Sequence, residues 1–268
     1  MIQFQNVTKK YGDHVVLNHV DLEVNGGEFM TIVGPSGAGK STLLHALIGA
    51  AKLDEGTIMV DGYDVTSFKE DALQEYRQKV GMVFQDYKLL KDKTVYENVA
   101  FALEVCGWKE EDIKERVYEV LDLVGMLDHE GKFPRQLAGG EGQRTAIARA
   151  MVHRPRLFIA DEPTGNLDPW NREGILDILN KINENGATVV LSTHNRELVD
   201  KIKRRVVVLN EGRIVADKEN SGYEVDALLS EAVEKVQEAE MAGELMGRMA
   251  EAIGSEVGDI EITEILEY

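Results

Sequence analysis

The sequence predicts an α/β fold in which a mostly parallel sheet is covered on both faces. Two observations carry this prediction. Short apolar runs of strand length alternate along the chain with longer segments of helical periodicity, as expected for strands joined by crossover helices. The runs at 29–33 and 157–160 are almost continuously apolar, as strands buried on both faces require, so we expect both at the centre of the sheet.

Local patterns predict the individual elements. Partial alternation predicts two strands within 1–28, and short apolar runs predict further strands at 29–33, 57–60, 80–84, 157–160, 188–193, 205–209 and 213–216. Turn residues separate several strands, at Asn25-Gly26-Gly27, Asp61-Gly62 and Asn210-Glu211-Gly212. Apolar residues three and four positions apart predict helices at 43–48, 94–105, 110–124, 140–152, 170–185 and 196–202.

The stretch 34–42 is the strongest chemical motif in the chain. It satisfies the pattern G-x-x-x-x-G-K-[ST] at every fixed position, between an expected strand and an expected helix. Glycines let backbone N–H groups approach phosphate oxygens, and the helix N-terminus adds unpaired N–H groups. Lys40 would supply a charge for the β- and γ-phosphates, and Ser41 a hydroxyl for Mg²⁺. We therefore expect a nucleoside triphosphate to be bound by Gly34, Pro35, Ser36, Gly37, Ala38, Gly39, Lys40, Ser41 and Thr42.

Asp161 and Glu162 form a second candidate site for the same chemistry. A buried strand that delivers a carboxylate to its open end is how P-loop proteins hold Mg²⁺ from the second side. Asp161 is the candidate metal ligand, and Glu162 the candidate base that polarises a water for in-line attack on the γ-phosphate. The alternative, a strand that merely ends in solvated acids, is weaker beside Lys40. Ligand sites of such sheets form at the strand C-termini, which is where we expect Gly34, Gln85, Asp161, Glu162 and His194.

Composition limits the setting in which the chain works. It has 268 residues, a formal net charge of −18 and one cysteine, Cys106, so no disulfide can form within it. We therefore expect a cytoplasmic location. The N-terminus lacks the apolar core of a signal peptide, and no run approaches the ~18 apolar residues of a membrane span. An acidic chain does not suit a nucleic-acid surface, which requires a basic face.

Two longer stretches resemble conserved segments of the ABC ATPase family. Residues 137–144 and 146–150 look like the signature segment of that family, and 159–168 resembles its Walker B and D-loop run. Gln85 matches the Q-loop, His194 the switch histidine, and Tyr11 the aromatic residue that stacks on adenine. Together with the stretch 34–42, these motifs follow the order of the family over residues 1–218.

The resemblance implies a fold and a set of site residues. The fold is that of a P-loop NTPase with a mixed, mostly parallel sheet, an antiparallel β part, a helical subdomain at about 87–155 and a C-terminal helical extension. The implied catalytic residues are Glu162, His194 and Lys40, and the implied Mg²⁺ ligands are Ser41, Gln85 and Asp161. Besides 34–42, the residues implied to contact ATP are Tyr11, Gln85, Ala138, Gly139, Gly140, Glu141 and Asp168.

The resemblance also implies partners. One chain carries one P-loop and one signature segment, and in the family each ATP is held between the P-loop of one copy and the signature segment of another. We therefore expect a homodimer that closes around ATP, reopens on hydrolysis and passes the movement to an integral membrane partner. The chain would then lie peripherally on the inner face of the cell membrane.

Within the family, residues 86–90 and 94–99 are most similar to the ATPase of the bacterial cell-division complex. Its membrane partner, a permease-like protein without a transport channel, would dock near residues 86–105 and activate cell-wall hydrolases outside. Lipoprotein and macrolide exporters share the run 164–168, so an exporter ATPase is kept as an alternative. A nucleotide-gated scaffold with little turnover is an alternative of another class.

Two residues depart from the usual signature of the family. Ala138 stands in place of a serine whose hydroxyl reaches the γ-phosphate held by the other subunit, and losing a bond to a charged oxygen costs ~1.5–3 kcal/mol. Gly142 lies early in an expected helix, where glycine costs about 1 kcal/mol relative to alanine. We expect ATP still to bind, with weakened dimer closure and slow turnover.

Residues 219–268 differ in character from the ATPase domain expected at 1–218. They contain 14 acidic and 2 basic residues, a net charge of −12. An apolar stripe that begins at Val225 predicts a helix, and alternation over 259–263 predicts an edge strand or a short linear motif. The segment is interpreted as an acidic extension. A docking helix, a helix packed on its own domain and a solvated arm remain open for it.

Overall fold

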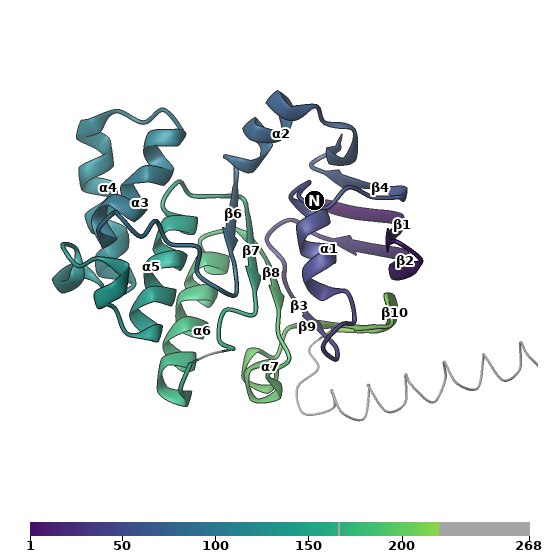
Figure 1. Ribbon diagram of the computed structural model, residues 1–268. Helices are drawn as coiled ribbons and strands as arrows, with labels where there is room; N and C mark the ends of the chain where they lie inside the picture. Colours follow the sequence, from purple (N-terminus) through teal and green to yellow (C-terminus); the bar gives the residue numbers. More distant parts are fainter. Residues whose placement is uncertain (166, 220–268) are drawn as a thin grey trace, which may run out of the picture.

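The computed structural model describes residues 1–165 and 167–219 and arranges them as two sheets with flanking helices (Figure 1). The strands are β1 (Ile2–Tyr11), β2 (His14–Val24), β3 (Phe29–Val33), β4 (Glu55–Val60), β5 (Tyr63–Asp64), β6 (Val80–Val83), β7 (Leu157–Asp161), β8 (Thr188–Ser192), β9 (Arg205–Asn210) and β10 (Arg213–Lys218). The α-helices are α1 (Lys40–Leu47), α2 (Glu70–Arg77), α3 (Val95–Val105), α4 (Glu110–Leu123), α5 (Gly139–Met151), α6 (Pro169–Glu184) and α7 (Arg196–Ile202). Short 3-10 turns lie at Val65–Ser67, Leu127–His129 and Pro134–Gln136.

The larger sheet has six strands in the order β10-β9-β3-β8-β7-β6. Its strands from β9 to β6 are parallel, and only β10 runs antiparallel to its neighbour β9. The strands β3 and β7 lie inside this sheet, and every residue of both is buried. The expected mostly parallel sheet with 29–33 and 157–160 at its centre is therefore confirmed.

The smaller sheet is antiparallel, in the order β2-β1-β4-β5. Both of its long strands come from the alternating pattern at the start of the chain, since β1 pairs with β2 through the hairpin at Gly12 and Asp13. The strand β4 then pairs with the other side of β1. The antiparallel β part that the resemblance implied is present.

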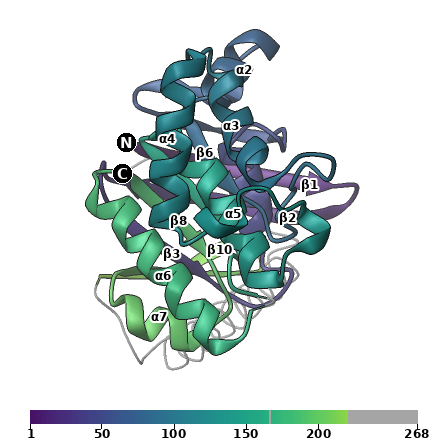
Figure 2. The same cartoon turned by 90° about the vertical axis from the view of Figure 1, so that its left-hand side faces the viewer.

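Each face of the six-stranded sheet has a different cover. One apolar core joins β3, β7 and β8 to α3, α4, α5, α6 and α7, and Figure 2 shows α3, α4, α5 and α6 in front of the strands. The other core joins the opposite face of the same strands to α1 and to the apolar face of β1, β2 and β4. The smaller sheet thus fills most of a face on which periodicity alone suggested helices.

The predicted helices and strands are all present, with ends shifted by a few residues. The helix α2 was not predicted, because none of its residues is fully buried and its apolar face consists of little more than Leu73 and Tyr76, too few for a clear helical period. The two-residue strand β5 is too short for a periodic pattern. The expectations for 220–268, and Asn166 of the expected D-loop run, lie outside the described residues. Among the helices within 1–165 and 167–219, none is both long and apolar enough to cross a bilayer.

Candidate active site

The loop between β3 and α1 has the geometry that a phosphate cradle requires. Gly34 has φ +155°, and a Cβ added there would lie 2.0 Å from the carbonyl oxygen of Leu209. Gly39 has φ +103°, and its added Cβ would lie 2.6 Å from the carbonyl oxygen of Val16. Both glycines are therefore required, because any side chain would collide with a backbone carbonyl oxygen of β9 or β2. The loop can in consequence present its backbone N–H groups closely to an anion.

Lys40 is buried at the mouth of this loop. Its Nζ donates hydrogen bonds to the carbonyl oxygens of Gly34 at 2.8 Å and Pro35 at 3.1 Å. The same Nζ lies 3.9 Å from Oε1 of Glu162. Since the lysine begins α1, its charge adds to the positive end of that helix. The loop thus holds one cation where phosphate oxygens would approach.

Glu162 lies between Lys40 and His194. Its Oε2 accepts a hydrogen bond from the backbone N–H of His194 at 3.3 Å and lies 2.9 Å from His194 Nδ1. Its backbone has φ +49°, a left-handed conformation uncommon for glutamate, and its N–H donates to the Ser192 carbonyl oxygen at 3.1 Å. The carboxylate is buried while His194 is exposed. The structure therefore brings all three expected catalytic residues together.

The strand register explains this convergence. Ile32 of β3 pairs with Ser192 of β8, and Ser192 pairs with Asp161 of β7. Three parallel strands thus end at the same edge of the sheet, and the residues just beyond the ends carry the candidate chemistry. Ser192 belongs to the site although the sequence analysis did not single it out. Its Oγ donates to Asp161 Oδ1 at 2.5 Å, and the only sequence signal was a hydroxyl at the end of an apolar strand.

The expected metal ligands have the chemistry that Mg²⁺ requires. Ser41, Gln85 and Asp161 offer a hydroxyl, an amide and a carboxylate oxygen, which are donors that Mg²⁺ prefers. Asp161 is buried, and Ser192 fixes one of its two oxygens. Gln85 is exposed in the turn after β6. In residues 1–165 and 167–219, no group of three or more His, Cys, Asp or Glu side chains could hold a metal ion. Three such donors do not fill the octahedral shell of Mg²⁺, so water and phosphate oxygens would complete it.

The expected signature residues lie at the start of α5 and away from the loop 34–42. Ala138 is the N-cap of α5, and Glu141 Oε2 accepts a hydrogen bond from the Ala138 N–H at 2.9 Å. Glu141 Oε1 lies 3.2 Å from His129 Nδ1 and 3.9 Å from Lys132 Nζ. A Cβ added at Gly139 would meet Tyr87 and Leu167, and one added at Gly140 would meet Asn171 of α6; neither would meet the loop 34–42. One described chain thus holds two separate halves of the expected site.

Asp168 and Tyr11 are placed apart from the catalytic cluster. Asp168 is the N-cap of α6, and its carboxylate accepts hydrogen bonds from Asn171 Nδ2 at 2.6 Å and Asn171 N at 3.1 Å. These bonds hold the pKa of Asp168 below its usual value. Tyr11 ends β1 with an exposed ring, and Lys9 Nζ lies 4.9 Å from the ring centroid. Neither residue contacts Lys40, Glu162 or His194 in the described hydrogen bonds and ion pairs.

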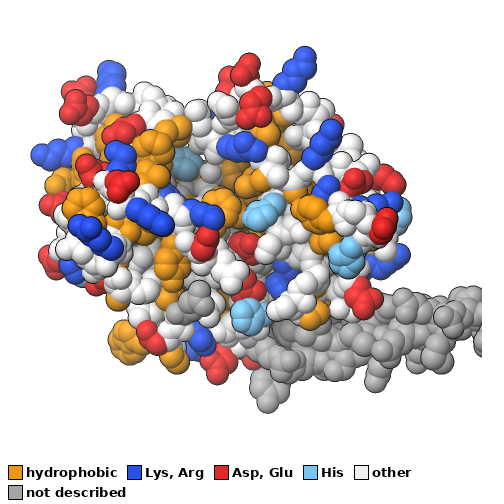
Figure 3. Space-filling model, in the orientation of Figure 1, with side chains coloured by type: hydrophobic (Ala, Val, Ile, Leu, Met, Phe, Trp, Pro, Cys, Tyr) orange, Lys and Arg blue, Asp and Glu red, His pale blue; other side chains and the backbone are white. Residues whose placement is uncertain are grey.

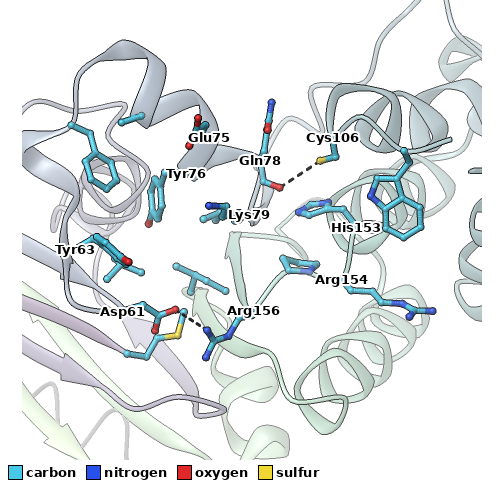
Figure 4. A pocket seen from close by; sticks show the side chains of 18 residues that line it. Asp61, Tyr63, Glu75, Tyr76, Gln78, Lys79, Cys106, His153, Arg154 and Arg156 are labelled. Atoms are coloured by element: carbon cyan, nitrogen blue, oxygen red, sulfur yellow. Dashed lines mark hydrogen bonds and ion pairs between the residues drawn. The ribbon is translucent and has the colours of Figure 1, made fainter.

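A cavity of about 930 Å³ lies at the amino ends of β6 and β7, at the opposite edge of the sheet from Lys40, Glu162 and His194 (Figure 4). Figure 4 shows Tyr63, Tyr76 and Asp61 on one side of it, and Cys106 and His153 on the other. Asp61 Oδ2 lies 3.3 Å from Arg156 Nη1 across its floor. None of its lining residues falls within 86–105, the segment expected to meet a membrane partner, although Cys106 and Trp108 adjoin that segment.

Acidic and basic side chains are interspersed over the face drawn in Figure 3. The described surface in this view shows no single basic field of the kind that grips nucleic acid, in keeping with the acidic net charge.

Comparison with known proteins gives consistent matches. The family model described as "ABC transporter" matches residues 17–165. The cell division ATP-binding protein FtsE of Streptococcus pneumoniae serotype 2 is 47% identical over 227 residues, covering 84% of this chain and 99% of that protein. The methionine import ATP-binding protein MetN of Carboxydothermus hydrogenoformans is 45% identical over 202 residues, covering 75% of this chain and 60% of that protein.

The structure is also similar to solved structures of MJ0796, a bacterial ABC transporter cassette. One is a dimeric structure with a TM-score of 0.77 and 35% sequence identity, covering 83% of this chain and 100% of that chain. Another, at 34% identity and the same TM-score, is a dimeric post-hydrolysis state bound to ADP and Pi. The six-stranded sheet, the smaller antiparallel sheet and the flanking helices therefore form a known arrangement.

Proposed function

The chain belongs to the ABC transporter family of ATP-binding proteins, and on that premise we propose that it is the ATP-hydrolysing subunit of an FtsEX-like cell-division complex. It is an ATPase, which binds ATP and hydrolyses it to ADP and phosphate. The observation that carries the enzymatic part is the convergence of Lys40, Glu162 and His194 at one edge of the sheet. The likeness to FtsE over nearly its whole length supports the cell-division part.

In the proposed reaction, the loop 34–42 and Lys40 hold the phosphates. Glu162 accepts a proton from a water molecule as that water attacks the γ-phosphorus and the bond from phosphorus to the β,γ-bridging oxygen breaks, which releases ADP and phosphate. His194, whose position Glu162 fixes through the backbone N–H and Nδ1, would hold that water and the γ-phosphate in line. Mg²⁺, when bound by Ser41, Gln85 and Asp161, would neutralise phosphate charge. Tyr11 would stack on the adenine ring.

The second half of the site would come from a second copy of the chain. Ala138, Gly139, Gly140 and Glu141 lie at a helix N-terminus, where backbone N–H groups favour an anion. Within the chain, the space beside Gly139 and Gly140 is taken by residues outside the loop 34–42. In the proposed dimer, these residues would therefore contact the ATP held by the partner copy. Asp168 would lie at the same dimer interface. The dimeric MJ0796 cassettes support this arrangement.

The membrane partner would be an FtsX-like permease that docks beside α3. Phe101 and Val105 are exposed on that helix, and Cys106 and Trp108, which follow it in the chain, line the cavity of Figure 4. An apolar rim of this kind fits a short amphipathic segment of a partner. Such docking would keep the chain peripheral on the inner face of the cell membrane, and the stroke would control cell-wall hydrolysis.

We assign the ATPase domain to residues 1–218 and the helical subdomain to about 87–155, with 219–268 as an acidic extension. The helices α3, α4 and α5 share one core in this region, which supports the subdomain. A transport ATPase is the second candidate function, because the importer ATPase MetN is 45% identical over its shared 202 residues. Which membrane protein co-purifies with the chain separates the two candidates.

The enzymatic proposal is tested by two substitutions and a control. Lys40→Ala should weaken ATP binding at least ~100-fold, because it removes the charge at the phosphate site. Glu162→Gln should bind ATP within about threefold of wild type while kcat falls ~10²-fold or more, since only the base is lost. Lys52→Ala, at an exposed lysine after α1, is the control for a lost positive charge. Wild-type turnover from Glu162→Gln would rule out this residue as the base.

A further inference from the structure

The loop after Gln85 is bound to α5 by contacts that the proposed reaction does not require. Arg149 of α5 donates hydrogen bonds from Nη1 to the Lys88 carbonyl oxygen at 2.8 Å and from Nη2 to the Tyr87 carbonyl oxygen at 2.9 Å. Tyr87 and Lys88 have φ +62° and +48°, so two consecutive non-glycine residues are left-handed. Such a conformation persists only where the surroundings over-determine it, and Arg149 is part of those surroundings.

The ring of Tyr87 occupies space that a side chain at position 142 would need. A Cβ added at Gly142 would lie 3.2 Å from Tyr87 Cδ2 and 3.4 Å from its Cε2. A Cβ added at Gly139 would lie 3.7 Å from the Tyr87 hydroxyl oxygen. The ring is half-buried, and burial raises its pKa. Glycine at 142, an unfavourable residue early in a helix, therefore has a structural reason: it leaves room for this ring.

We propose that Tyr87, Gly142 and Arg149 form a latch that makes the loop after Gln85 and the start of α5 move as one body. This inference rests on the proposed function, in which Gln85 serves the ATP of its own subunit and the start of α5 serves the ATP of the partner copy. The latch connects these two places within one chain. Tyr87 and Arg149 are positioning residues, because they act through Gln85 and through the glycines of α5. The ring packing and the two carbonyl bonds hold the loop from two sides.

The first test is steady-state ATP hydrolysis by the full-length chain with three substitutions. Tyr87→Ala and Gly142→Gln should each lower kcat ~fivefold or more with KM for ATP within about twofold, because the loss is in positioning and not in binding. Tyr87→Phe should behave as wild type, since it keeps the ring. The double variant should be no slower than the slower single variant, because both changes break the same contact. Unchanged kcat in the single variants, or effects that multiply, would overturn the latch.

A second test uses amide hydrogen exchange of Glu162→Gln, which retains ATP, with and without Mg-ATP. Protection should rise together in residues 86–92 and 138–146 when the latch is intact. Adding Tyr87→Ala should leave the rise in 138–146 and abolish the rise in 86–92, whereas adding Tyr87→Phe should change neither. Parallel protection in all three variants would refute the latch. A wild-type chain without ATPase activity would refute the proposed function. The latch could still be tested by comparing amide exchange of residues 86–92 in Tyr87→Ala and Tyr87→Phe. Faster exchange in Tyr87→Ala would support the latch, and equal rates would refute it.

Discussion

Ala138 shows how one side chain at a helix start affects both folding and chemistry. As the N-cap of α5 it has no oxygen to accept an N–H of the first turn, and Glu141 supplies only the reciprocal bond, to the Ala138 N–H. A serine here would complete a capping box with Glu141. It would also restore the hydroxyl that the family places on the γ-phosphate of the partner copy. The present residue therefore leaves both the cap and the expected dimer contact short of one bond.

We expect Ala138→Ser to raise the ATPase rate of the assembled complex ~tenfold, because a hydrogen bond to a charged oxygen contributes ~1.5–3 kcal/mol. The matched control is Ala138→Gly, since glycine caps helices nearly as well as serine but carries no hydroxyl. Only the serine variant should accelerate hydrolysis in a phosphate-release assay. An unchanged or lower rate with serine, or an equal gain with glycine, would contradict the assignment.

The candidate catalytic residues could be predicted because each stands at a fixed place in a local motif. Lys40, Glu162 and His194 follow apolar strands, and the structure brings them to one edge. Ser192 and Tyr87 could not be found in this way, because their roles depend on contacts across the chain. Ser192 reaches Asp161 because β8 pairs in register with β7, and Tyr87 packs beside Gly142, which lies 55 positions later in the chain. No local pattern encodes either distance.

Among the elements, those with an apolar stripe or a buried run were predicted and those without were not. The helix α4 was predicted within one residue of its ends because its buried residues recur at helical spacing. The helix α2 buries none of its residues fully, and its two large apolar residues, Leu73 and Tyr76, are too few to give a clear helical period. Which strands pair was harder to predict than which segments are strands. Alternation in β1 and β2 indicated strands, but it did not indicate that they form a separate sheet over one face of the larger sheet.

The helix α3 carries the prediction that belongs to this scale. Its buried residues pack into the core, while Val105 is 48% exposed and immediately precedes Cys106, which lines the cavity of Figure 4. We expect Val105→Asp to reduce co-purification of the membrane partner ~tenfold, because a charge at an apolar contact must be desolvated. ATP binding by the purified chain should not change, since Val105 lies outside the loop 34–42.

The control for this variant is Val15→Asp, which adds the same charge at a valine that is 36% exposed on β2. It should leave co-purification as in wild type. Equal loss of the partner from both variants would indicate a general effect of added charge, and no loss from Val105→Asp would place the docking surface elsewhere.

At the scale of the whole molecule, the described residues already form closed cores. The apolar faces of both sheets are covered by helices or by each other, and β10 is the edge strand of the larger sheet among the described residues. Residues 219–268 contribute −12 of the net charge of −18, so residues 1–218 carry only about −6. Charge of one sign concentrated in one segment is typical of a solvated or partner-binding arm and not of a core element.

We therefore expect a chain that ends at residue 224 to fold and to bind ATP as the full-length protein does, with Kd within about twofold, because the loop 34–42 and both cores lie within 1–219. The measurements are ATP titration and thermal unfolding of the full-length and the truncated chain. Lys40→Ala in each of them is the control that shows whether ATP binds at the same site. An insoluble truncated chain, or one whose Tm falls by ~10 °C or more, would show instead that the acidic extension completes the fold. If ATP binding and stability are retained but co-purification of the membrane partner is lost, the extension contributes to partner binding and not to ATP binding. Its concentrated negative charge favours that outcome.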